Sequence, residues 1–313
     1  MSDEKRLIII DSNALLHRSF HALPPLTTKK GEQTGAVYGF LLTLFKAIKD
    51  LKPDYIAACF DTPASTFRHQ KFKDYKAQRP KTPEELSQQI PKIKKILERF
   101  EIPVFEKDGF EADDLISTIT EKAKQGSEIY ILTGDLDNLQ NVDENVRVYT
   151  LGRGIKETVI YDAEKVSSRF GIRPDQMVEF KILVGDSSDN IPGILGIGKK
   201  TAADLLKEFN SLENIFQKIK EGAAEIPART KEVLLKSKAQ ISLSRELVET
   251  RKDVPIEFKI QKCQFGGFNK EKAEEILKEF EFNSLIRRLA EFNRTEGGET
   301  TSEEKRKTVL KLL

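Results

Sequence analysis

Apolar residues in the first half of the chain form short continuous runs that alternate with segments of helical spacing. The runs Leu7–Ile10, Tyr55–Phe60 and Ile129–Leu132 are each followed, at once or after a short turn, by a carboxylate. Runs that are apolar at every position are typical of strands buried on both faces. Between the runs, apolar residues recur every three or four positions and predict helices. They are Val37, Leu41, Leu44, Phe45, Ile48 and Leu51 in one segment, Leu86, Ile90, Ile93, Leu97 and Phe100 in the next, and Leu115, Ile116 and Ile119 in a third. This alternation predicts an α/β fold with a mostly parallel sheet between helical layers.

After about residue 165 the pattern changes to helices separated by Gly, Asn and Pro. The expected helices are Met177–Gly185, Lys199–Phe209, Leu212–Lys220, Arg229–Leu243, Lys270–Phe280 and Ser284–Phe292, with a turn-rich connection at Asp189–Gly198 and a short strand at Val254–Ile260. The segment from Asn293 is polar and linker-like. We therefore expect an α/β core over residues 1–165, a helical region over 166–292 and a tail over 293–313.

Nine carboxylates stand where they can gather at one edge of such a sheet. They are Asp11 and Asp61 after two predicted strands; Glu111, Asp113 and Asp114 at the start of the helix after a strand at Ile102–Phe105; Asp135 and Asp137 in the turn TGDLD; and Asp186 and Asp189. One such acid alone is explained as a helix cap or a turn former, but the repetition at successive strand ends is not. Ligands of parallel sheets bind at the carboxyl ends of the strands, and crowded carboxylates need cations among them. A set of oxygen ligands without clustered His or Cys favours Mg²⁺ or Mn²⁺ over zinc.

The histidines and cysteines add no further ligands to this set. His17 and His21 lie four residues apart on a predicted helix with no third ligand evident, so we expect surface or packing roles for them. Cys59 lies within a strand run and is expected to be a small buried hydrophobe. Cys263 is far from it in the chain, so neither a disulfide scaffold nor a thiolate zinc site is expected.

Residues 66–81 form a basic segment with interleaved aromatic residues directly after Asp61. Its six basic residues are Arg68, Lys71, Lys73, Lys76, Arg79 and Lys81, against the single acid Asp74, and Phe67, Phe72 and Tyr75 stand between them. A solvated charged helix is the usual meaning of such a run. The rings and the position beside Asp61 favour instead a grip on single-stranded nucleic acid, in which cations hold phosphates and rings stack on bases.

A glycine-rich turn, Gly193–Gly198, lies between two predicted helices and is followed by Lys199 and Lys200. It is not a nucleotide-binding phosphate loop, because Lys stands at position 200 where Ser or Thr is required and no strand precedes it. Gly193, Gly196 and Gly198 instead suit a helix-hairpin-helix, whose backbone N–H groups and lysines hold a DNA phosphate without reading sequence. Asp186 and Asp189 precede this hairpin, so we expect duplex binding and metal binding to be coupled.

The charge balance changes this interpretation little. The chain has 52 Lys and Arg against 50 Asp and Glu, a net charge of +2, which taken alone argues against a polyanionic partner. Because nine of the acids are assigned to one pocket, this balance conceals a basic surface around an acidic site. The longest apolar runs are far shorter than the roughly 20 residues that a bilayer requires, and no signal peptide opens the chain. We expect a protein of the reducing cytoplasm with no membrane partner.

Six segments resemble one known family. They are IIIDSNALLHRSFHALPPLTT, TGAVYGF, FDTPASTFRHQKFKDYKAQRPKTPEEL, GFEADDLI, LTGDLDNLQ and VGDSSDNIPGILGIGKKTA. Together they resemble the 5′ nuclease (flap endonuclease-like) family, in particular the 5′→3′ exonuclease domain at the N-terminus of bacterial DNA polymerase I. The resemblance covers about residues 6–292.

The resemblance implies a three-layer α/β/α core, a helical arch at about 62–83 over the active site, and a helix-three-turn-helix at about 182–209. It implies that Asp11, Asp61, Glu111, Asp113, Asp135, Asp137, Asp186 and Asp189 bind divalent metals, with Asp114 a further acidic position. Arg68, Tyr75, Lys76 and Arg79 would contact the 5′ strand or the scissile phosphate, with Lys71 a further DNA contact, and the hairpin would bind K⁺. Leu136 and Leu195 stand where the family often has Lys and Pro. These departures concern the fine tuning of the activity and remove no metal ligand.

The function implied is hydrolysis of DNA phosphodiesters at 5′ flaps, nicks and gaps, and the protein is expected to be a monomer. Such a reaction serves DNA repair and the removal of RNA primers from RNA–DNA hybrids. Two Mg²⁺ ions would take part, with Lys76, Arg79, Asp113 and Asp135 as catalytic residues. Asp11, Asp61, Glu111, Asp113 and Asp135 would hold the ion nearer the chemistry, and Asp137, Asp186 and Asp189 the second. A non-catalytic DNA-binding paralogue and a PIN-like ribonuclease remain as alternatives. The polar tail is compatible with a stand-alone protein. It is equally compatible with a piece that is joined to a DNA polymerase or cooperates with one.

Overall fold

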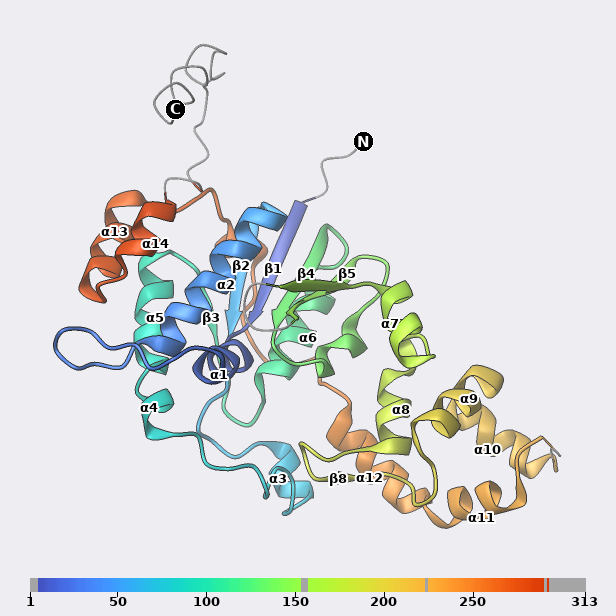
Figure 1. Ribbon diagram of the computed structural model, residues 1–313. Coiled ribbons are helices and arrows are strands. Elements are labelled where there is room, and N and C mark those ends of the chain that lie inside the picture. The colour runs from blue at the N-terminus through green and yellow to red at the C-terminus, as the bar shows by residue number, and fades with distance from the viewer. Residues whose placement is uncertain (1–4, 153–156, 223–224, 290–291, 293–313) are drawn as a thin grey trace, which may run out of the picture.

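A six-stranded sheet forms the centre of the molecule (Figure 1). The computed structural model describes residues 5–152, 157–222, 225–289 and 292, so the predicted tail 293–313 lies outside the described residues. The strand order is β3-β2-β1-β4-β5-β6, and only β6 runs antiparallel to its neighbour. The predicted α/β fold with a mostly parallel sheet is thus confirmed. The strands of the sheet are β1 (Lys5–Asp11), β2 (Tyr55–Cys59), β3 (Val104–Phe105), β4 (Ser127–Thr133), β5 (Val146–Leu151) and β6 (Thr158–Tyr161).

The central strand β1 shows why its sequence is apolar at every position. Leu7 pairs with Tyr55 of β2 on one side and with Ile129 of β4 on the other. Ile8 and Ile10 point into one buried cluster, whereas Leu7 and Ile9 belong to the cluster on the opposite face. A strand with helices on both faces has no solvent-facing side, so alternation is lost. Cys59 of β2 is completely buried among these side chains, as predicted.

Helices cover both faces of the sheet and form the three predicted layers (Figure 1). None of the helices in the described ranges is both long and apolar enough to span a bilayer. One face is covered by α1 (Ser12–Ala22), α2 (Gly35–Leu51), α5 (Ile90–Arg99), α13 (Lys270–Glu279) and α14 (Asn283–Leu289), and the other by α6 (Ala112–Ala123), α7 (Ala163–Phe170) and α8 (Met177–Val184). The remaining elements are α3 (Phe67–Lys71), α4 (Glu84–Ser87), α9 (Lys199–Phe209), α10 (Leu212–Lys220), α11 (Ala228–Lys236), α12 (Lys238–Val248), the two-residue strands β7 (Gly185–Asp186) and β8 (Ile191–Pro192), and the 3₁₀ helices η1 (Asp137–Asn141), η2 (Pro174–Gln176) and η3 (Ile260–Cys263).

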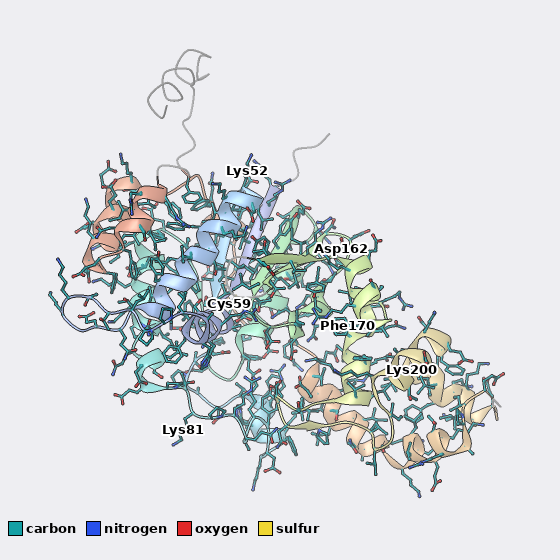
Figure 2. The ribbon with its side chains drawn as sticks, in the orientation of Figure 1. Lys52, Cys59, Lys81, Asp162, Phe170 and Lys200 are labelled. Carbon is teal, nitrogen blue, oxygen red and sulfur yellow. The ribbon has the colours of Figure 1, made fainter. Side chains whose placement is uncertain are left out.

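Helices α9 to α12 lie together around one end of α8, and α9 and α12 both contact α8 (Figure 1). Lys200, at the start of α9, is on this group (Figure 2). Leu205 of α9 and Ile215 of α10 belong to the same buried cluster as Ile9 and Ile131 of the sheet. The helical region therefore shares a hydrophobic core with the α/β layers. The predicted domain division at about residue 165 stays a prediction.

Several local predictions were wrong. The single helix expected over 229–243 is divided at Ser237 into α11 and α12, since Ser favours helix ends over helix interiors. The apolar stretch 86–100 is likewise divided, because Pro91 lies in the first turn of a new helix, α5. The strand expected at Val254–Ile260 does not form. Strands β5 and β6 were not predicted, because Arg147 and other polar residues interrupt their apolar pattern.

Candidate active site

Seven of the nine predicted acids line one cavity of about 630 Å³ at the carboxyl ends of β1, β2 and β4. This is the edge at which ligands of parallel sheets bind. The eighth, Asp186, lines a small adjoining cavity, and the ninth, Asp114, lines neither of the two. The seven are Asp11, Asp61, Glu111, Asp113, Asp135, Asp137 and Asp189.

The first two acids are held by backbone groups at the starts of helices. Asp11 ends β1 and caps α1, accepting a hydrogen bond from the Ala14 N–H at 3.1 Å, while its other oxygen accepts from Thr133 Oγ1 at 2.6 Å. Asp61 accepts from the Ala112 N–H at 2.7 Å at the start of α6. Helix N-termini stabilise negative charge, so both carboxylates are fixed without a cation.

Asp113 lies in the first turn of α6 and receives a hydrogen bond from a residue that sequence reasoning missed. Asn138 Nδ2 donates to Asp113 Oδ1 at 2.8 Å. Asn138 is almost completely buried, and its own oxygen accepts a bond from Asn141. The pair therefore orients the carboxylate of Asp113, which lines the cavity. An Asn in a short 3₁₀ turn gives no sequence signal for this role.

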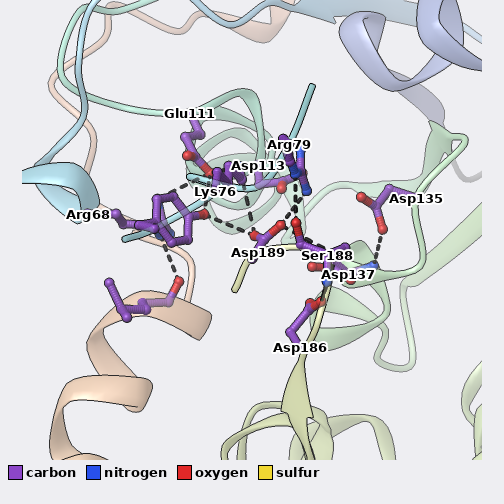
Figure 3. Close-up of polar contacts among 12 residues, drawn as sticks. Arg68, Lys76, Arg79, Glu111, Asp113, Asp135, Asp137, Asp186, Ser188 and Asp189 are labelled. Atoms are coloured by element: carbon purple, nitrogen blue, oxygen red, sulfur yellow. Dashed lines mark hydrogen bonds and ion pairs between the residues drawn. The ribbon is translucent and has the colours of Figure 1, made fainter. Parts of the chain in front are cut away.

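Asp137, Asp186 and Asp189 form a second group at the edge of the cavity (Figure 3). Each offers one carboxylate oxygen, and these oxygens lie within 4.8 Å of one another, close enough to hold one metal ion. Asp186 is fixed by the N–H and the hydroxyl of Ser188 at 2.8 and 2.6 Å. Lys181 of α8 makes ion pairs with Asp137 and Asp186. Lys181 was not among the predicted residues, although a lone Lys in the apolar run MVEFKILV is a usable signal.

The basic segment places two cations in the same cavity. Lys76 Nζ lies 2.9 Å from Glu111 Oε2, and Arg79 pairs with Asp189 (Figure 3). The Lys76 N–H also donates to the Asp189 carbonyl at 3.0 Å, which ties the segment to the loop between β7 and β8. Burial alone would lower the pKa of Lys76, but the charges of Glu111 and Asp189 outweigh it and raise that pKa.

The helical arch expected over 62–83 is helical only at α3, and α3 is followed by turns that contact the loop between β7 and β8. Tyr75 is buried, and its hydroxyl donates to Glu111 and Asp189, so its ring is not presented for stacking on a base. Lys71 is half exposed and pairs with Glu246. The DNA contacts of Tyr75 and Lys71 stay predictions.

Arg68 and Asp114 pair with each other, away from the cavity. Arg68 donates two parallel hydrogen bonds to the Asp114 carboxylate at 2.7 and 2.8 Å, and both side chains are almost fully buried. Arg68 also donates to the Leu247 and Glu249 carbonyls, which joins α3 to the end of α12. Removing one partner of such a pair costs about 3–5 kcal/mol. This geometry fits neither the metal role predicted for Asp114 nor the DNA role predicted for Arg68, and assigns both to the fold.

Backbone segments approach each other closely at the glycine-rich turn Gly193–Gly198. A Cβ atom at Gly193 would lie 2.3 Å from the Val184 carbonyl carbon, and Gly196 has a φ of +87°, which favours glycine. Gly198 precedes α9, which has no side-chain cap, and Lys199 and Lys200 are exposed beside it. The first N–H groups of α9 are thus available to an anion.

His17 and His21, predicted as surface or packing residues, line the cavity together with Asn13 and Arg18. All four come from α1, whose start is fixed by Asp11. Burial lowers the pKa of His17, and the charges of His21 and Arg79 lower it further. His17 is therefore a neutral polar group at neutral pH. The four-residue spacing on a helix that begins at a site acid was the signal that could have placed the histidines here.

Two sequence models of one family match consecutive parts of the chain. The N-terminal resolvase-like domain of 5′-3′ exonuclease matches residues 6–171, and the C-terminal SAM fold of 5′-3′ exonuclease matches residues 172–271. This chain belongs to the 5′-3′ exonuclease family. The resemblance seen in the sequence motifs is thereby confirmed.

Relatives of this 5′-3′ exonuclease family member include proteins of two lengths. The chain is 41% identical over 292 residues to DNA polymerase I of Bacillus subtilis, covering 93% of this chain and 33% of the polymerase. It is 40% identical over 286 residues to a 5′-3′ exonuclease of Aquifex aeolicus, covering 91% of this chain and 95% of that protein. The chain thus spans about a third of the length of the polymerases that it matches.

Solved structures of 5′ nucleases share the fold of this 5′-3′ exonuclease family member. A complex of the bacteriophage T5 flap endonuclease with DNA and metal ions has a TM-score of 0.63, is 20% identical, and covers 92% of this chain and 100% of that one. A T5 5′-exonuclease with bound zinc ions has a TM-score of 0.61 at 20% identity, with 92% and 99% covered. At this identity the likeness shows the fold.

The acids of this 5′-3′ exonuclease family member fit a divalent cation electrostatically. Burial raises the pKa of Asp11 to about 7, and the charges of Asp61 and Asp135 add to the rise. The hydrogen bond from Thr133 acts in the opposite direction and lowers that pKa. Burial and the charge of Asp135 likewise raise the pKa of Asp137 to about 7, and burial and Asp11 raise that of Asp113 well above its usual range. A hard cation among these oxygens would relieve the repulsion and return the acids to their charged form.

We expect the protein in EDTA to lose stability as pH rises from about 4 to about 7. Asp11 and Asp137 keep their protons up to a pH of about 7 when folded, but lose them near 3.8 when unfolded. The folded state therefore binds more protons within this window, so the free energy of unfolding falls with pH. Thermal unfolding in EDTA should show a lower Tm at pH 7.5 than at pH 5.

Two comparisons check this origin of the pH dependence. The Asp137→Asn variant lacks one of the two groups and should show a smaller difference in Tm. Added Mg²⁺ should restore the Tm at pH 7.5, because a bound cation stabilises the charged carboxylates. A Tm in EDTA that is equal or higher at pH 7.5 would contradict the explanation.

Proposed function

We propose that this chain is a divalent-metal-dependent 5′→3′ exonuclease and flap endonuclease that hydrolyses DNA phosphodiesters at 5′ flaps, nicks and gaps. The observation that carries the proposal is the meeting of seven carboxylates with Lys76 and Arg79 in one cavity. The names of the relatives, which include a 5′-3′ exonuclease and a flap endonuclease in complex with DNA and metal ions, support the same reaction.

Mg²⁺ is the proposed cofactor, and Mn²⁺, which also prefers oxygen ligands, is expected to substitute for it. Asp113 and Asp135 with the acids from β1, β2 and α6 would hold one ion, and Asp137, Asp186 and Asp189 would hold or organise a second. Bound at these carboxylates, the ions would supply an activated water and charge stabilisation for an in-line displacement.

The other parts of the site would position and neutralise the substrate. Lys76 and Arg79 place positive charges in the cavity beside the acids, where they can offset charge that develops on a scissile phosphate. Asn138 would keep Asp113 oriented toward the cavity. Neutral His17 and the side chain of Asn13 line the entrance, where they can donate hydrogen bonds to a DNA strand.

Recognition would depend on the shape of the DNA and not on its sequence. The hairpin Gly193–Gly198 and the N-terminus of α9, with Lys199 and Lys200, are the proposed grip on the duplex phosphates. This contact is expected to weaken steeply with salt. A K⁺ ion at the hairpin, and a role on hybrids of RNA primer and DNA, stay predictions. A link to a polymerase is supported by the polymerase I relatives, and a separate protein by the exonuclease of similar length.

One assay separates the proposed reaction from its alternatives. Purified protein is incubated with labelled 5′-flap DNA and with labelled single-stranded RNA, each in Mg²⁺ and in EDTA. We expect cleavage of the flap DNA in Mg²⁺ and no cleavage of it in EDTA. Binding of the flap DNA without cleavage would indicate a non-catalytic paralogue, and preferred cleavage of the RNA would indicate a PIN-like ribonuclease.

A further inference from the structure

Lys181 is the basic residue of the mostly apolar helix α8, near the candidate metal groups. It is in the last turn of α8, and only 16% of its side chain is exposed. Its ammonium pairs with Asp137 and lies 2.8 Å from Asp186 Oδ2. Burial would lower the pKa of Lys181, but the two carboxylates outweigh it and raise that pKa. The ammonium is therefore a permanent positive charge at this position.

The same carboxylates belong to the group that can hold a metal ion. Asp137, Asp186 and Asp189 offer oxygens within 4.8 Å of one another, and Lys181 is bonded to two of the three acids. The small cavity that Lys181 lines with these acids has a volume of about 20 Å³. That volume holds about one water molecule. A divalent ion that keeps several of its waters, as Mg²⁺ does, needs more room than this, so its waters would lie on the side of the large cavity that Asp137 and Asp189 also line.

Two like charges cannot share these oxygens at low cost. An ammonium and a divalent ion a few ångströms apart repel each other, and each competes for the same carboxylate lone pairs. The acids are also fixed by other partners, since Ser188 holds Asp186 and Arg79 pairs with Asp189. The part that can move is the long side chain of Lys181.

We propose that Lys181 is the internal counter-ion of the second divalent site, where its ammonium contacts Asp137 and Asp186 in the metal-free protein and must be displaced when a divalent cation binds. This inference rests on the proposed metal-dependent function. Lys181 thereby makes the second site weak while it keeps the metal-free fold stable. Binding of the second ion and ion pairing of Lys181 oppose each other, and the coupling is reciprocal.

The test is direct binding of Mn²⁺ to the protein without DNA. Metal-free wild type, Lys181→Met and Lys181→Gln are titrated with Mn²⁺, and free Mn²⁺ is counted by electron paramagnetic resonance. We expect the weaker of two binding steps to become at least about tenfold tighter in both variants, since one unit of opposing charge is removed. Thermal unfolding in EDTA should give both variants a lower Tm than wild type, and saturating Mn²⁺ should remove this difference.

Lys165→Met is the matched control, because Lys165 is an exposed residue of α7. It loses the same charge far from the acids and should bind Mn²⁺ as wild type does. If Lys181→Met and Lys181→Gln fold and bind both Mn²⁺ ions with wild-type affinity, the inference about Lys181 is overturned. The proposed function would then stay in place. If wild type itself bound no Mn²⁺, the proposed function would fail together with the inference.

Discussion

Replacing Asp135 with Asn is expected to slow Mg²⁺-dependent cleavage of a 5′-flap DNA by more than about 100-fold, because loss of outer partners of metal ligands alone costs 10–100-fold. Asp135 lines the cavity, and its Oδ1 accepts the Asp137 N–H at 3.0 Å. The amide oxygen of Asn can keep this bond, so the turn should be preserved while the charge is lost. Asp113→Asn should behave in the same way, because the side-chain oxygen that remains at position 113 can still accept the hydrogen bond from the Asn138 amide.

Binding and folding have to be measured beside the cleavage rate of these variants. The affinity for flap DNA in EDTA should stay close to wild type, because the proposed duplex grip lies on the hairpin and α9. Asp108→Asn, at an exposed loop position outside the cavity, is the matched control and should cleave at the wild-type rate. Near-wild-type cleavage by Asp135→Asn or Asp113→Asn would remove these acids from the proposed site.

The central strands and the acids that follow them were predictable because one physical cause determines both. A strand covered by helices on both faces must be apolar throughout, and its carboxyl end is where a polar side chain first reaches solvent. Asp11 and Asp61 therefore have a clear sequence signal. Strands β5 and β6 had none, because β6 lies at the edge of the sheet and β5 contains Arg147, which reaches outward to Glu128.

The parts of the site that escaped prediction depend on contacts between distant segments. Asp114 follows Asp113 directly, and only the fold shows that it points inward to Arg68, 46 residues away, while its neighbour points into the cavity. The resemblance implied a helical arch over the basic segment, but polar contacts with the loop between β7 and β8, such as that of Lys76 with Asp189, hold much of it in turns. Spacing in the sequence cannot distinguish a charge that faces a ligand from one that faces a buried partner.

Lys76 combines an unusual backbone with a central position in the cavity. Its φ of +55° lies in the left-handed region, which non-glycine residues rarely adopt and which is found at functional sites. The hydrogen bond from its N–H to the Asp189 carbonyl holds this conformation. Its ammonium reaches Glu111 at 2.9 Å and Asp189 at 3.9 Å. The fold therefore supports a strained residue so that one cation stands beside the acids.

Replacing Lys76 with Ala is expected to slow single-turnover cleavage of a 5′-flap DNA by about 100-fold, the usual cost of one lost group that stabilises charge in the transition state. The affinity for the same DNA should change only a few-fold, because one phosphate contact among several carries little of the binding energy. Single-turnover rates with enzyme in excess, beside fluorescence anisotropy in EDTA, separate the two effects.

Lys73→Ala distinguishes a local role of Lys76 from the general charge of the segment. Lys73 is exposed three residues earlier, so its loss removes the same charge without changing the cavity. We expect Lys73→Ala to weaken DNA binding at low salt about as much as Lys76→Ala does, and to leave the single-turnover rate unchanged. An unchanged rate in Lys76→Ala would refute its catalytic role. A group held beside the scissile phosphate can affect the rate of the chemical step more than it affects binding. Equal slowing in both variants would therefore mean that the segment acts through its summed charge.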